Sequence, residues 1–230
     1  MRKFLAFLFA AVLAFGFAGN AIAAEDDAPS FALTLTGGYT VLPMSIHGVT
    51  WYRFKDKRET IETNDDSYLD PGYPLGLSFS YFPKGGPLPL YIAVEGDYRN
   101  QQGKLKGSVG PFAQQEYYEY DTSWEFIELH FLAGLSFWRG PFRPFLQLGF
   151  GAARTSLEIE SDKQVLYAGS VLADLGAEYR FAPWFAWGAQ ARFQDVFGLR
   201  WEYDAGKTYL AVGNSEVIPL SLLMRVSFLF

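Results

Sequence analysis

Hydrophobic and polar residues alternate along the last segment of the chain, residues 218–230. Its apolar face consists of Ile218, Leu220, Leu222, Met224, Val226, Phe228 and Phe230. The opposite face is mixed and contains Arg225. Alternation with a period of two predicts a β-strand, because successive side chains of a strand point to opposite faces. A strand with one face for lipid and one for a polar interior is typical of transmembrane β-barrels.

The same alternation recurs in earlier segments. The predicted strands are residues 31–41, 75–81, 90–99, 117–138, 144–160, 165–181, 184–197 and 218–230. In the fourth of them, an apolar face runs from Ile127 through Leu129 to Phe137, while Glu128 and His130 lie on the other face. The sequence therefore predicts an all-β fold, a transmembrane antiparallel up-and-down β-barrel of about eight strands.

Two kinds of connection alternate between these strands. The polar connections are 43–74, 100–115, 161–164 and 198–217, and the short connections rich in Pro or Gly are 83–87, 139–143 and 182–183. Short periplasmic turns and long extracellular loops are the pattern of outer-membrane barrels, and an even number of strands places both termini in the periplasm. The long segments around Tyr52 and Tyr117 leave room for an additional hairpin.

The N-terminal segment has the features of an export signal. Arg2 and Lys3 precede an apolar run, and small residues occupy both ends of Ala21-Ile22-Ala23. This pattern predicts a secretory signal peptide over residues 1–23, cleaved after Ala23, and one barrel domain over residues 24–230. Beyond the signal, no apolar run approaches the ~18 residues that a membrane helix needs.

Composition narrows the possible functions. The formal net charge is −6, which argues against nucleic acid as a partner. The chain contains 0 Cys, so that thiolate catalysis, thiolate metal sites and lipidation of an N-terminal Cys are excluded. Aromatic residues make up 18% of the chain, which suits the aromatic girdles of a barrel at the two membrane interfaces.

Two motifs carry a resemblance to a known family. The segment from Arg143 to Ala152 reads RPFLQLGFGA, and the chain ends in VSFLF, with Phe228 and Phe230 on the apolar face. The whole chain after residue 23 resembles the small outer-membrane β-barrel family of the OmpA, OmpX and OmpW kind. The resemblance implies location in the bacterial outer membrane, contact with its lipid and lipopolysaccharide, and insertion by the barrel-assembly machinery, which would read Phe228 and Phe230. It says little about function, because that family includes adhesins, resistance factors, weak channels and structural proteins.

The predicted inward face is rich in charge. The ionisable residues expected in the lumen are Glu95, Asp97, Arg99, Glu128, His130, Asp174, Glu178, Arg180, Arg192 and Arg225. The lumen of a barrel of about eight strands is just wide enough for side chains to fill. Because an isolated buried charge costs several kcal/mol, these residues should form ion pairs, with Asp174 and Arg192 opposite one another. The leading hypothesis is a lumen plugged by ion pairs; the alternative is a narrow channel or porin for small or apolar solutes.

An enzymatic function has weaker support. His130 follows Glu128 on the same face, but lipid A deacylases of similar size use a His-x-Ser pair, and here two apolar residues follow the histidine. A lipid A palmitoyltransferase places a His, an Asp and a Ser near its outer rim, and His47, Asp121 and Ser123 are not diagnostically spaced for that role. We therefore predict a non-enzymatic protein without cofactor or metal, with a role in the envelope structure or in surface interactions through its extracellular loops. No surface ligand can be named from the sequence.

Overall fold

The computed structural model describes residues 29–40, 44–45, 49–53, 60–62, 68–84, 89–109, 116–137, 141–204 and 209–230. The regular secondary structure in these residues consists of β-strands. No helix in them is long and apolar enough to cross a membrane. The predicted signal peptide, residues 1–23, lies outside the described residues.

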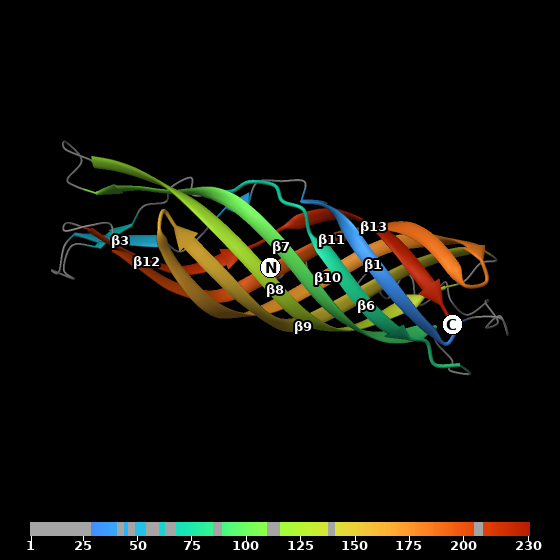
Figure 1. Ribbon diagram of the computed structural model, residues 1–230. Coiled ribbons are helices and arrows are strands. Elements are labelled where there is room, and N and C mark those ends of the chain that lie inside the picture. The colour runs from blue at the N-terminus through green and yellow to red at the C-terminus, as the bar shows by residue number, and fades with distance from the viewer. Residues whose placement is uncertain are drawn as a thin grey trace.

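Eight of the strands close into a ring (Figure 1). They are β1 (Phe31–Thr40), β6 (Leu75–Tyr81), β7 (Leu90–Val109), β8 (Glu116–Ser136), β9 (Phe142–Ile159), β10 (Asp162–Ala182), β11 (Phe185–Asp204) and β13 (Leu220–Leu229). Each of these strands pairs antiparallel with the next one in the ring. The last strand, β13, pairs with β1, and in this pairing Leu35 lies opposite Val226. The predicted up-and-down barrel of about eight strands is confirmed.

The other strands of the described residues extend one end of the barrel. They are β2 (Met44–Ser45), β3 (Val49–Arg53), β4 (Thr60–Glu62), β5 (Tyr68–Leu69) and β12 (Tyr209–Val217). β3 pairs with β4, so the first long connection contains the additional hairpin that the sequence left open around Tyr52. β12 joins this hairpin to β11. We call this end of the barrel the loop end, and the opposite end, where the C-terminus lies, the turn end (Figure 1).

The strands at the loop end are longer than predicted. β7 and β8 stay paired up to Val109 and Glu116, so most of the segment 100–115, predicted as a loop, is strand. The apolar alternation ends there because Asn100 and Gln102 on the outer face lie above the apolar belt and are exposed. Similarly, a turn at Glu160 and Ser161 connects β9 to β10, in place of the predicted link 161–164.

The starts of two strands also differ from the prediction, and a third strand contains a bulge. β9 begins at Phe142, inside the segment 139–143 that was predicted as a turn. β13 begins at Leu220, because Pro219 lacks the N–H that a strand pairing requires. In β11, the register shifts between Val196 and Leu199, where Gly198 adopts a positive φ of 81°. This bulge marks the point at which β11 changes its partner from β13 to β12.

The outer surface of the ring is apolar. Leu129 and Phe131 are 51% and 52% exposed, whereas their neighbours Glu128 and His130 are 4% and 0% exposed. A surface with so many exposed large apolar side chains suits lipid rather than water. Aromatic residues at the turn end, such as Trp184, belong to this exposed surface. The predicted position of Phe137 on the outer face is wrong. Its side chain is only 8% exposed, because it follows the end of β8.

The interior has two parts. At the loop end it is apolar, and we call this cluster the loop-end core. Its buried members are Leu69, Leu105, Trp124, Phe126, Ala153, Leu157, Ile159, Leu166, Val196, Leu199, Trp201 and Val217. Towards the turn end, charged and polar side chains fill the lumen.

Candidate functional site

Arg192 lies at the centre of the polar interior. From β11 it reaches Asp174 on β10, with Nε donating to Oδ1 and Nη2 to Oδ2, both at 2.8 Å. Its Nη1 donates to Asp97 Oδ1 on β7 at 2.9 Å, and its Nη2 also donates to Glu95. One guanidinium thus joins three carboxylates from strands of both sides of the ring. We call Arg192, Glu95, Asp97 and Asp174 the middle cluster.

A second cluster lies nearer the turn end. Glu178 accepts hydrogen bonds from Arg225, with Nε to Oε1 at 2.8 Å, and from Arg143. Ser227 donates to the same Oε1 at 2.8 Å. The Arg225 guanidinium stacks over Phe145, 4.4 Å from the ring centroid. We call Arg143, Glu178 and Arg225 the turn-end cluster.

A third pair lies between the middle cluster and the loop-end core. Arg99 and Glu128 are buried, with Nη2 and Oε1 4.0 Å apart. Gln194 connects them, since its Nε2 donates to Glu128 at 2.8 Å and its Oε1 accepts from Arg99 at 3.2 Å. The Arg99 guanidinium also lies 4.4 Å from the ring centroid of Phe126, a member of the loop-end core. Arg99 therefore forms the boundary between the polar and the apolar interior.

His130 belongs to a relay of hydrogen bonds. Its Nδ1 lies 3.1 Å from Asp97 Oδ2, and its Nε2 lies 3.0 Å from Ser170 Oγ. This is the connectivity of a Ser–His–Asp catalytic triad, assembled from β10, β8 and β7. However, Ser170 is 1% exposed and Gln194 Nε2 already donates to its Oγ at 3.0 Å. A substrate carbonyl has no access to Ser170, so the relay is closed.

Glycines make space for these side chains in the narrow lumen. A Cβ on Gly76 would lie 2.5 Å from Asp97 Oδ1, and one on Gly151 would lie 2.8 Å from His130 Cδ2. Both distances are shorter than real Cβ contacts allow. The polar interior therefore depends on close approach of the backbone at these two positions.

The structure places the sequence-predicted lumen residues in different surroundings. Nine of the ten are buried and belong to the contacts above, whereas Arg180 is half-buried and lies beside the turn, where its N–H donates to Pro141 O at 2.7 Å. Sequence reasoning missed Arg143 as a lumen residue, because a short Pro- and Gly-containing stretch was interpreted as a turn. It also missed Tyr91 and Gln147, which bond to each other from β7 and β9. From the sequence, the inward direction of these two side chains could be inferred only from their odd or even position along each strand.

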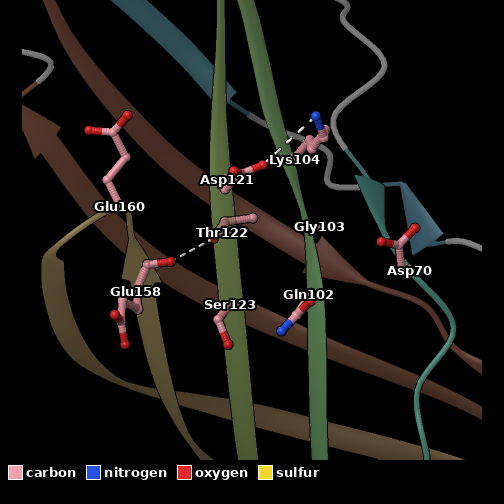
Figure 2. Close-up of a pocket in the computed structure, with 9 residues that line it drawn as sticks. All are labelled: Asp70, Gln102, Gly103, Lys104, Asp121, Thr122, Ser123, Glu158 and Glu160. Carbon is pink, nitrogen blue, oxygen red and sulfur yellow. Dashed lines mark hydrogen bonds and ion pairs between the residues drawn. The ribbon is translucent and has the colours of Figure 1, made fainter.

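An open pocket of about 440 Å³ lies outside this polar interior, at the loop end (Figure 2). Asp70, Asp121, Glu158 and Glu160 are among the residues that line it, and Lys104 Nζ lies 3.8 Å from Asp121 Oδ1. Lys104 also donates to Glu119, and this hydrogen bond holds the pKa of Glu119 below its usual value. Exposed ion pairs of this kind contribute little to stability.

The enzymatic alternative with His47, Asp121 and Ser123 gains no support at this end. Asp121 and Ser123 lie on β8, and His47 lies outside the described residues. No group of His, Asp and Glu side chains in the described ranges is arranged to hold a metal ion.

The C-terminus completes the ring. The backbone N–H of Phe230 donates to Phe31 O at 2.9 Å, and the N–H of Phe31 donates back to Phe230 O at 3.1 Å. The Phe230 side chain is 68% exposed, and Phe228 contacts Phe185 with ring centroids 6.1 Å apart. The last residues therefore form the seam between the first and last strands.

Comparisons with known proteins identify the fold. No protein-family model matches the chain, and no curated protein matches it in sequence. The solved structure of the outer membrane protein OprG from Pseudomonas aeruginosa matches with a TM-score of 0.51 and 12% identity, covering 86% of this chain and 97% of that one.

Two further solved structures are similar at lower TM-scores. Neisserial surface protein A matches at 0.47 with 16% identity, covering 85% of this chain and 96% of that one. The outer membrane protease OmpT from Escherichia coli matches at 0.46 with 8% identity, covering 92% and 100%. At these sequence identities a structural likeness shows the fold alone, and the match to OprG is the one that supports the fold assignment. Together with the closed ring and its apolar outer surface, it shows that this chain has the fold of the small outer-membrane β-barrels, with eight antiparallel up-and-down strands.

Proposed function

We propose that this chain is a non-enzymatic protein of the bacterial outer membrane, closed to ions, which acts in envelope structure or surface interaction through its loop end. In this arrangement the turn end faces the periplasm, and the loop end faces the outside. Outer-membrane lipid and lipopolysaccharide surround the apolar belt. Residues 1–23 serve as the cleaved export signal.

The contacts of Arg192 carry the proposal. Its guanidinium bonds to β7 and β10 at once, and these strands are not neighbours in the ring. The lumen is bridged at this level by side chains that are at most 8% exposed. A barrel of eight strands leaves little room beside such a bridge. The turn-end cluster and the loop-end core lie on either side of it and support the same conclusion.

The strands beyond the apolar belt support the proposed role of the loop end in envelope structure or surface interaction. β7, β8, β9 and β10 continue as a paired sheet beyond the belt, and β11, β12, β3 and β4 form a second one. Both are at the loop end (Figure 1). Ordered sheets of this length offer a rigid surface to a partner, and rigid surfaces bind with a lower entropic cost than flexible loops.

Conductance is the direct test of the closed lumen. The refolded protein in a planar bilayer should show no steady ion current, because charged side chains and the loop-end core fill the path. A refolded general porin in the same bilayer serves as the positive control. A steady current with reproducible unit conductance would contradict the plug and favour a channel.

One observation favours the alternative, a path for small apolar solutes. β10 pairs with β11 only from Gly169 towards the turn end, although both strands continue further. Beyond that point, the side chain of Gln164 bonds to the backbone of Glu202 in place of a strand pairing. The loop-end core lies behind this part of the wall. Faster uptake of a small aromatic solute by vesicles containing the barrel than by empty vesicles would support this alternative over the closed barrel.

We expect Phe230 to direct assembly. Deleting it removes the exposed terminal aromatic and one pair of backbone hydrogen bonds in the seam with β1. The outer-membrane level of the protein should fall, and unfolded chain should accumulate in the periplasm. Cell fractionation with a gel test for heat-modifiable barrel measures both pools. Deletion mutants that assemble at the normal level would contradict an assembly role for Phe230.

A further inference from the structure

The buried ionisable groups do not balance. Among the described residues, the buried charged side chains comprise five carboxyls, four guanidiniums and one imidazole. The carboxyls are Glu95, Asp97, Glu128, Asp174 and Glu178, and the guanidiniums are Arg99, Arg143, Arg192 and Arg225. With a neutral imidazole and every carboxyl ionised, the polar interior carries one negative charge in excess. An uncompensated charge inside a membrane protein is costly.

The excess lies in the middle cluster. The turn-end cluster has two guanidiniums for one carboxylate, and Arg99 with Glu128 is balanced. The middle cluster has three carboxylates around Arg192 alone. The middle cluster is therefore short of two positive charges. The surplus guanidinium of the turn-end cluster offsets one of them, and the other is needed beside Glu95, Asp97 or Asp174.

Glu95 has the one carboxylate oxygen of this cluster that lacks a partner. Its Oε1 accepts from Arg192, but its Oε2 has no donor within reach, although the residue is 0% exposed. The neighbouring group is Asp97, two residues along the same face of β7, and both carboxylates accept hydrogen bonds from the one guanidinium of Arg192. Two carboxylates are both acceptors, so that a hydrogen bond between them requires a proton.

His130 is already satisfied without a charge. Gln194 donates to Ser170, the Ser170 hydroxyl can donate to Nε2, and Nδ1–H can donate to Asp97. An imidazolium would donate from both nitrogens, and Ser170 Oγ would then accept from His130 and from Gln194, with neither of them an acceptor for its own hydrogen. The hydrogen-bond relay thus fits the neutral tautomer, assigned from its partners.

We propose that Glu95 and Asp97 form a buried site for one proton, which Glu95 Oε2 carries and donates to the Asp97 carboxylate. One proton closes the charge balance of the polar interior as a whole, because the middle cluster then keeps one negative charge and the turn-end cluster carries one positive charge. The groups that face it are Asp97 on β7 itself, His130 on β8, Asp174 on β10, Arg192 on β11 and, by electrostatic interaction, Arg225 on β13. From β6, the register partner of Glu95 is Ser78, which does not titrate in this range. This inference rests on the proposed closed lumen, because free access of water and ions would remove the need for the proton.

A proton held only by the folded state makes stability depend on pH. Glutamate in the unfolded chain ionises near pH 4.3, so above that pH the folded protein binds one more proton than the unfolded one. Stability then falls as pH rises, and the unfolding equilibrium constant increases up to tenfold per pH unit until the folded site itself ionises.

Glu95→Gln tests the site with an isosteric, uncharged side chain, whose NH2 group can donate to Asp97 as the protonated acid does. Urea unfolding of the refolded barrel in lipid vesicles is measured between about pH 6 and pH 8. The variant should fold, and the logarithm of its unfolding constant should rise less steeply with pH than that of the wild type, by up to one unit per pH unit. Glu178→Gln is the matched control, since it leaves two guanidiniums without their shared carboxylate and should destabilise at every pH.

Other outcomes would overturn the proposal. Equal pH slopes for wild type and Glu95→Gln exclude the proton at this site, and a slope that is lost in His130→Gln places it on the imidazole. A wild-type stability that depends on Na⁺ or K⁺ concentration at constant pH assigns the missing charge to a metal cation. If Glu95→Gln does not fold, the infrared spectrum of the wild type decides, because the proposal requires a protonated carboxyl band at neutral pH. A steady current through the same samples would instead contradict the closed lumen, independently of the pH slopes.

Discussion

Replacing Arg192 by alanine is expected to lower the free energy of unfolding by about 3–5 kcal/mol, the largest loss among single substitutions in the polar interior. The substitution leaves Asp174 and Asp97 buried without the guanidinium that compensates them. Water cannot solvate carboxylates at this buried position, and protonating them to neutral acids also costs free energy. Urea unfolding of the refolded barrel in vesicles, followed by tryptophan fluorescence, measures the change.

Arg154→Ala is the matched control for this experiment. Arg154 lies on β9 with an exposed side chain, so the same truncation there should change the free energy of unfolding by no more than about 0.5 kcal/mol. Arg192→Ala should also be examined in the planar bilayer, because removal of the bridge between β7 and β10 can open a leak. Equal stability of Arg192→Ala and Arg154→Ala, together with a change in ion selectivity, would mean that Arg192 lines a channel.

Leu129→Arg should cost about 2–4 kcal/mol, because it places a charge on the lipid face near the middle of the bilayer. Leu129 is 51% exposed on β8, seven residues from the end of that strand at Ser136. With a climb of roughly 2.3 Å per residue on a tilted strand, it lies roughly 16 Å from the turn end. The same unfolding experiment measures the loss.

Ser123→Arg provides the comparison on the same strand and the same face. Ser123 is six residues nearer the loop end, roughly 14 Å higher along the membrane normal, and its side chain is partly exposed beside the polar pocket. Arginine there should cost about 0–1 kcal/mol. Similar losses at both positions would show that depth in the bilayer does not control the effect, and would contradict the assignment of the outer face to lipid.

Much of the barrel was readable from the sequence. The alternation of period two placed Leu129 on the outer face and Glu128 on the inner one, because a strand between lipid and a polar lumen must alternate at every residue. The number of strands and their antiparallel order followed from the same pattern. The prediction failed where lipid no longer constrains the outer face, so that the paired segment up to Val109 was interpreted as a loop. It also failed at Phe137 and at Arg143, next to the turns.

The partners of the charged residues were decided by the tertiary structure. Glu95 and Arg192 are 97 positions apart in the sequence and meet because closure of the ring brings β7 and β11 to face each other across the lumen. Parity along a strand determines that a side chain points inward, but its level and its partner depend on the stagger of all eight strands. Arg143 shows this most clearly, since its contact with Glu178 follows from the β9–β10 register, in which the two residues lie opposite one another. The sequence alone thus determined the faces of the barrel, whereas the pairing, and with it the charge imbalance in the middle cluster, arose from its closure.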